Sequence, residues 1–178
     1  MSMIDFILDE HTFRPLWRRA VSETTSLRTQ RRETMLYFES SDLRTSNFFE
    51  LIQHLLKIKG DSSFWTIILD PDPFNYFHEN FKKFPGFVHN SHNTENDFFE
   101  ILNRDPGGNP ADSLADNGQQ YVVMPEQGEW IIFGDRSWDT GVLSGQPDIM
   151  KAAQSNYRFF IEPVEDFRIE PYCSPAND

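Results

Sequence analysis

The chain has 178 residues, a length that fits a single domain, and 15% of them are aromatic, which is ample material for a buried core. Its formal net charge of −12 at pH 7 argues against nucleic acids and anionic membranes as partners, because their phosphates attract clustered positive charge. The single cysteine, Cys173, excludes an internal disulfide, and the lack of both a signal-like run and a stretch of roughly 20 apolar residues predicts a cytoplasmic protein.

The first 32 residues form a basic N-terminal segment. They carry six arginines and four acids, whereas residues 33–178 carry ten basic and 24 acidic residues, a net charge of −14. The arginines could bind a phosphate or an acidic surface, but a solvated face that pairs with the acidic remainder is the favoured interpretation. Apolar spacing predicts a short helix around residues 4–8 and a second helix from Pro15 to about Glu23, followed by a loop.

The next part of the chain alternates between strands and helices. Residues 35–38 predict a strand, and the near-continuous apolar run 64–69 predicts a central strand that is covered on both faces. A short edge strand is expected at residues 87–88. Apolar residues recur at helical spacing in three stretches. The predicted helices span residues 47–59, 73–83 and 95–103.

The clearest fold signal is a β-hairpin over about residues 120–134. Two apolar, β-favouring runs, Tyr121–Met124 and Trp130–Phe133, flank the turn Pro125–Gly128, which has Pro early and Gly late. The stretch before it, residues 105–118, is rich in Gly, Pro and Asp and is expected to be an exposed, mobile loop. The remaining predicted elements are strands over residues 138–143 and 157–161, a helix over residues 147–153, and a loose tail over residues 171–178.

Together these elements predict one α+β domain over residues 1–178. The sheet would be mostly antiparallel, because a hairpin lies at its centre and pairs neighbouring strands in opposite directions. The predicted helices would cover it.

No motif in the chain predicts catalysis or a cofactor. His89 and His92 have a spacing that permits two metal ligands, but no second cluster completes the set, so polar loop histidines are the favoured interpretation. The serines lack a nucleophile elbow, and the glycines form no phosphate-binding loop. We therefore expect no bound metal and no cofactor, and we favour binding over enzymatic activity.

Polar residues gather at the connection that follows the hairpin. Asp135, Arg136 and Asp139 lie beside Trp130 and Trp138 in the sequence and could form a polar rim around aromatic binding anchors. We favour a structural role for these residues over a binding role, because turns that flank strands commonly contain Asp. In that structural role Asp135 caps the turn, Arg136 pairs with Asp139, and both tryptophans belong to the core.

Asp70 and Asp72, together with Glu126 and Glu129 at the turn of the hairpin, could form an acidic surface that faces a partner. A cationic protein would be attracted and steered by such a surface. The candidate partner-binding residues are therefore Glu126, Glu129, Trp130, Asp135, Arg136, Trp138 and Asp139.

The segment from Tyr121 to Leu143, with its two β runs, its Gly-containing turn and the sequence GDRSWDTGVL, resembles the C-terminal segment of small bacterial immunity-type proteins from polymorphic toxin systems. The resemblance covers about two dozen of the 178 residues. It implies a cytoplasmic α/β protein that neutralises a toxin by direct binding, without catalysis.

We thus expect an acidic inhibitor with a basic protein partner, such as a toxin domain. The alternative is a small enzyme or a small-molecule-binding protein with a pocket beside Arg136. A deep pocket with converging, strongly shifted pKa values would favour that alternative. The sequence leaves the oligomeric state open.

Overall fold

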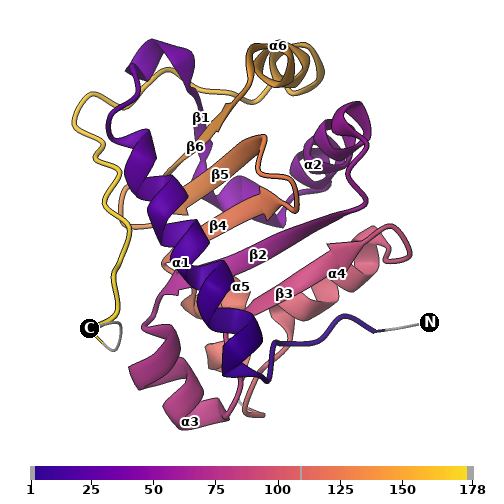
Figure 1. Ribbon diagram of the computed structural model, residues 1–178, viewed down its shortest axis with the longest axis vertical. Helices are drawn as coiled ribbons and strands as arrows, with labels where there is room; N and C mark the ends of the chain where they lie inside the picture. Colours follow the sequence, from indigo (N-terminus) through magenta and orange to yellow (C-terminus); the bar gives the residue numbers. More distant parts are fainter. Residues whose placement is uncertain (1–2, 109, 176–178) are drawn as a thin grey trace.

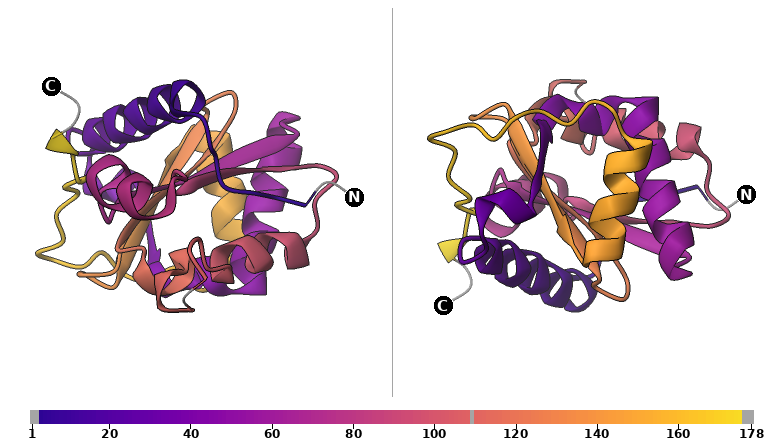
Figure 2. Two further views of the ribbon diagram at one scale, coloured as in Figure 1. Left: turned by 90° about the horizontal axis from the view of Figure 1, so that it is seen from below. Right: turned by 90° about the horizontal axis from the view of Figure 1, so that it is seen from above.

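The protein, described by a computed structural model for residues 3–108 and 110–175, has a six-stranded sheet between two layers of helices (Figure 1, Figure 2). All strand pairs are antiparallel, in the order β1-β6-β5-β4-β2-β3, which confirms the predicted α+β domain. The strands are β1 (Leu36–Glu39), β2 (Ser63–Asp70), β3 (Gly86–Asn90), β4 (Gln120–Pro125), β5 (Trp130–Asp135) and β6 (Thr140–Gly145).

The helices lie on both faces of this sheet. Helix α1 crosses one face, and α2, α4 and α6 cover the other (Figure 1, Figure 2). The α-helices are α1 (Glu10–Leu27), α2 (Ser46–Lys59), α3 (Glu79–Phe81), α4 (Glu95–Asn103), α5 (Leu114–Asn117) and α6 (Pro147–Asn156). Shorter helical turns are η1 (Arg32–Thr34), η2 (Ser40–Arg44), η3 (Pro73–His78, a π-type turn) and η4 (Pro110–Asp112).

The predicted hairpin is the centre of the sheet. Strands β4 and β5 pair in the register Gln120 with Asp135 and Val123 with Ile132. Side chains alternate across each strand, so Val123 and Ile132 pack beneath α2, α4 and α6, whereas Val122 and Phe133 pack beneath α1. Because helices cover both faces, these strands are apolar on both faces as well.

The N-terminal region differs from the prediction of two short helices. Residues 10–27 form one continuous helix, α1, and Asp9 caps it by accepting a hydrogen bond from the Thr12 N–H at 3.0 Å. Pro15 lies inside this helix and does not end it. Trp17, Ala20 and other side chains on one face of α1 are fully buried against the sheet, and this packing outweighs the local cost of the proline. The preceding residues are extended, with Ile7 paired to Phe84.

The stretch 105–118 is not a plain exposed loop, because it contains η4 and α5 and buries Leu114. Strand β6 begins two residues later than predicted, since Asp139 adopts a left-handed turn conformation with φ of 49°. The short edge strand expected at residues 87–88 is confirmed as β3.

The predicted strand over residues 157–161 is wrong, because only one bridge, between Tyr37 and Ile161, forms there. Residues 157–175 instead run as an irregular strap along the side of the sheet (Figure 1); we call them the C-terminal strap. Arg32 holds it by donating hydrogen bonds to the carbonyls of Val164, Glu165 and Phe167.

The end of the C-terminal strap is tied down, whereas residues 171–178 were expected to be a loose tail. The Tyr172 N–H donates to Gln120 at 2.7 Å, and the Ser174 hydroxyl donates to Asp72 at 2.8 Å. Residues 176–178 lie outside the described residues. In the part of the chain that is described, no helix has the length and apolar character needed to cross a membrane.

Candidate functional site

The antiparallel topology gathers carboxylates at one end of the sheet. The last residues of β1, β2 and β5 and the first residues of β4 and β6 lie side by side there, as the pairs Asp70–Gln120, Gln120–Asp135 and Asp135–Thr140 show. Three further acids come from the turns that follow β1, β2 and β5. We define the acidic end as Glu39, Asp42, Asp70, Asp72, Asp135 and Asp139.

One half of the acidic end lies around η2. Asp42 is half-buried and accepts a hydrogen bond from the Tyr157 hydroxyl at 2.5 Å. Burial raises the pKa of Asp42, and the charges of Glu39 and Asp139 raise it further, against the hydrogen bond from Tyr157. The pKa of Tyr157 is raised by burial and by its bond to Asp42. The three carboxylates lie close enough for their charges to interact, so this half of the acidic end concentrates negative charge.

The other half lies where β2 and β5 end. Burial raises the pKa of Asp70, and the charges of Asp135 and Asp72 add to that effect. For Asp72, burial also raises the pKa, but hydrogen bonds from the Asn75 and Phe74 N–H groups and from Ser174 together lower it below its usual value. The ionised Asp72 therefore stabilises the fold, whereas the ionised Asp70 lowers its stability.

Asp135 and Arg136 have structural partners. Asp135 is only 3% exposed and accepts hydrogen bonds from Gln120 at 2.7 Å and from the Ser137 N–H at 2.9 Å, which confirms its predicted capping role. Arg136 does not pair with Asp139. Its guanidinium donates to the carbonyls of residues 115, 116 and 118, at 3.3, 2.7 and 3.3 Å, and so ties α5 to the sheet.

The two tryptophans of the candidate site have different environments. Trp138 is 40% exposed in the β5–β6 turn, and its ring meets the edge of Phe167 at a centroid distance of 6.1 Å. Trp130 is 1% exposed and belongs to the core beneath α2 and α6. Trp130 therefore cannot be an interface anchor, and Trp138 is the exposed aromatic beside the acidic end.

The seven candidate residues do not form one surface. Glu126 and Glu129 lie at the opposite end of β5 from Asp135, about 17 Å away at the usual rise of a strand. Glu129 pairs with Lys59 at 3.0 Å, and Arg19 donates to the Glu126 carbonyl. The negative charge of this turn is thus partly neutralised within the protein.

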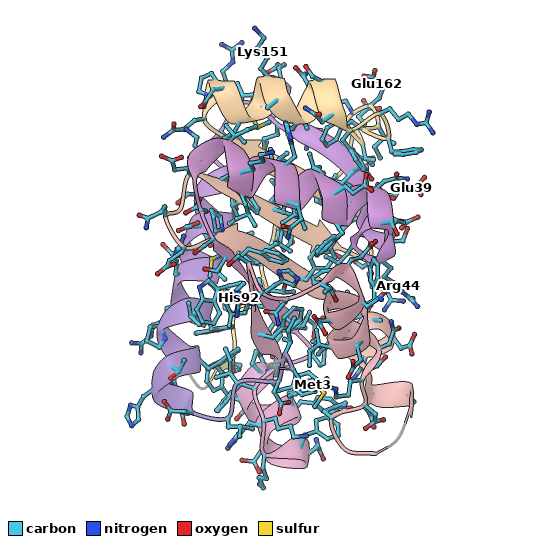
Figure 3. All side chains as sticks on the ribbon, turned by 90° about the vertical axis from the view of Figure 1, so that its right-hand side faces the viewer. Met3, Glu39, Arg44, His92, Lys151 and Glu162 are labelled. Carbon is cyan, nitrogen blue, oxygen red and sulfur yellow. The ribbon has the colours of Figure 1, made fainter. Side chains whose placement is uncertain are left out.

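Sequence reasoning missed the contribution of β1 to the site. Glu39 and Asp42 reach it only because β1 pairs with β6, with Glu39 opposite Thr140. In Figure 3, Glu39 and Arg44 point outward from the same side of the molecule. Arg44 is 3.9 Å from Asp116 and lies next to the acidic end. No local pattern in the sequence indicates this pairing of distant strands.

Replacing Asp70 with Asn should raise the midpoint of thermal unfolding at pH 7. The pKa of Asp70 is raised in the folded state. Its ionisation therefore lowers the stability of the fold as the pH rises through that pKa. Below the ordinary value of 3.8 the carboxyl is protonated in both the folded and the unfolded state, so it does not affect stability there. The gain should therefore vanish at about pH 3. Asp72→Asn is the matched control and should lower the midpoint at pH 7. Thermal unfolding curves at both pH values test this, and an unchanged midpoint for Asp70→Asn at pH 7 would contradict it.

A small cavity lies beside Arg136. Its volume is about 60 Å³, and Tyr121, Leu114 and Ile68 line it. This is well below the roughly 300–1,000 Å³ of typical small-molecule sites.

His89 and His92, whose spacing would permit two metal ligands, lie in different environments. His89 is buried in β3, where its ring stacks on Phe64, so it is not a polar loop residue, and His92 is exposed. Within residues 3–108 and 110–175, no three His, Cys, Asp or Glu side chains are grouped so that they could hold a metal ion.

No protein-family model, curated protein or solved structure matches the chain.

Proposed function

We propose that this protein is a binding protein whose acidic end docks a basic protein partner. The observation that carries the proposal is the concentration of six carboxylates at one end of the sheet, where burial, and to a lesser extent the charges of neighbouring carboxylates, raise the pKa values of Asp42 and Asp70. Repulsion between neighbouring carboxylates lowers the stability of the fold, and a bound cationic partner would reduce that repulsion. The exposed Trp138 supplies an aromatic anchor beside the charge.

The resemblance of residues 121–143 to immunity-type proteins supports a more specific form of this proposal. In that form, the basic partner is a toxin domain, and the protein neutralises it by direct binding without catalysis. The alternative, a small-molecule site beside Arg136, has less support, because the cavity there is small and the Arg136 guanidinium is already bound to three carbonyls.

Neutralising two charges at the acidic end should slow association with the partner about tenfold at low salt. The variant is Glu39→Gln with Asp139→Asn, since Asn tolerates the positive φ of residue 139. The matched control is Glu50→Gln with Glu126→Gln, which removes the same charge from exposed positions outside the acidic end.

The partner would first be captured from the native cell with the tagged protein and then purified. Stopped-flow association rates are then measured from low salt to about 1 M salt, where the Debye length falls to about 3 Å and the difference between variants should disappear. An equal slowing by both double variants would mean that only the net charge matters, and unchanged rates would place the docking face elsewhere.

A further inference from the structure

A second feature of the molecule is a cavity that shares none of the six carboxylates of the acidic end, although Phe167, which Trp138 contacts, lines it. This cavity of about 290 Å³ opens between the C-terminal end of α1, strand β1 and the C-terminal strap. Its floor is apolar, because Leu27, Met35 and Phe167 line it and are buried in the core on the α1 side of the sheet. Its volume is close to the lower limit of typical small-molecule sites, about 300 Å³, and several times that of the cavity beside Arg136.

Positive charge surrounds this cavity, although the protein is strongly acidic. Arg28, Arg32 and Arg168 line it, against one acid, Glu170. Arg32 is occupied by its bonds to the carbonyls of the C-terminal strap. The guanidinium groups of Arg28 and Arg168 form no ion pair with any described residue, and both residues are exposed. Two arginines from distant parts of the chain are thus available at one opening.

Tyr37 adds a polar group to the same cavity. The residue is 3% exposed, and its ring meets the edge of Phe167 on the α1 side of the sheet. Its hydroxyl makes no hydrogen bond within the described part of the chain, and Tyr37 lines this cavity and also a neighbouring one beside Tyr157 and Ile161. Buried polar groups are normally hydrogen-bonded, and a hydroxyl left without a partner in a cavity is suited to bind a ligand. Burial also raises the pKa of Tyr37, which keeps the hydroxyl protonated and able to donate.

We propose that this cavity binds a small organic anion with an apolar body, of the class of phosphate monoesters. Arg28 and Arg168 would balance the charge of the phosphate, and the Tyr37 hydroxyl would donate a hydrogen bond to it. The apolar body would lie on the floor formed by Leu27, Met35 and Phe167. Guanidinium groups suit phosphate oxygens because they present several N–H donors in one plane.

The probe for this site is phenyl phosphate, titrated into the ¹⁵N-labelled full chain and followed by NMR. We expect a dissociation constant on the order of 1 mM for a probe of this size. The amide shifts should be largest in residues 27–37 and 167–170. Inorganic phosphate should bind more weakly because it lacks the apolar body, and benzyl alcohol should bind more weakly because it lacks the charge. No shift up to about 10 mM phenyl phosphate, or shifts confined to another part of the chain, would overturn the proposal.

Three variants separate the site from general charge effects. Arg28→Gln with Arg168→Gln should weaken phenyl phosphate binding at least about tenfold, and Tyr37→Phe, which keeps the ring and removes only the hydroxyl, about fivefold. Arg31→Gln is the control, because Arg31 belongs to the same basic run but does not line the cavity. Equal affinity in all variants would overturn the assignment. This test can fail without affecting the proposed function, since none of these substitutions replaces a carboxylate of the acidic end.

Discussion

Replacing Trp130 with alanine should lower the free energy of unfolding by about 3–5 kcal/mol. Trp130 is among the largest fully buried side chains of the protein, and it begins the central strand β5 beneath α2 and α6. Alanine would leave a cavity that neighbours such as Ile149 of α6 could fill only in part. The indole N–H of Trp130 has no hydrogen-bond partner among the described residues, so Trp130→Phe should cost much less.

The matched control is Trp138→Ala, which removes the same side chain from an exposed turn. Its cost should be below about 1 kcal/mol, because Trp138 is 40% exposed and its ring meets that of Phe167 at a centroid distance of 6.1 Å. Urea unfolding followed by far-ultraviolet circular dichroism measures both variants. Similar losses for the two would contradict the assignment of one tryptophan to the core and the other to the surface.

Gly134→Ala should destabilise the protein by about 1–3 kcal/mol, although alanine is normally tolerated in a strand. A row of four residues crosses the sheet here: Tyr121 pairs with Gly134, Gly134 with Gly141, and Gly141 with Phe38. The two rings fold inward over the two glycines. A Cβ atom on Gly134 would lie 2.2 Å from Cζ of Tyr121, and one on Gly141 would lie 2.3 Å from Cζ of Phe38.

The Tyr121 ring cannot easily move aside, because its hydroxyl donates to the Ser40 carbonyl at 2.7 Å in a fully buried setting. A double-mutant cycle tests this cause directly. In a Tyr121→Ala background, the ring that would collide is gone, so adding Gly134→Ala should cost far less. Equal costs in both backgrounds would show that the destabilisation comes from the backbone rather than from the ring.

Local signals in the sequence predicted the centre of the fold well. The hairpin was predictable because its two strands are adjacent in the sequence and are joined by a turn with Pro125 and Gly128. The helix α2 was predictable from its apolar spacing, although it begins one residue earlier than predicted, at Ser46, and Thr45 caps it. Such elements depend on contacts between residues that are close in the sequence, so the spacing of their apolar residues predicts them.

Elements that depend on distant contacts could not be predicted in the same way. The C-terminal strap was interpreted as a strand and a loose tail, since nothing near Ile161 or Ser174 indicates that Arg32 and Asp72 hold it. Likewise, α1 continues through Pro15 because of its packing against the sheet. In both cases tertiary interactions outweigh local propensity.

The candidate site was predictable only where it is local. Asp135, Trp138 and Asp139 share one short turn, so their proximity follows from the sequence. Glu39 and Asp70 join them through the strand order, which brings the ends of β1, β2, β5 and β6 together. From the sequence, both Trp130 and Trp138 could be either binding anchors or core residues. Their exposure depends on which helices cover each strand, and no local pattern indicates that.

Carboxyl footprinting of the complex with the captured partner tests the central claim most directly. A carbodiimide and a small amine modify exposed carboxylates, and mass spectrometry measures the extent at each residue with and without the partner. If the acidic end is the docking face, the partner should protect Glu39, Asp42 and Asp139, and it should leave Glu126 at the opposite end of β5 as reactive as in the free protein. Protection of Glu126 with full reactivity at Glu39 and Asp139 would contradict the account and place the interface at the hairpin turn.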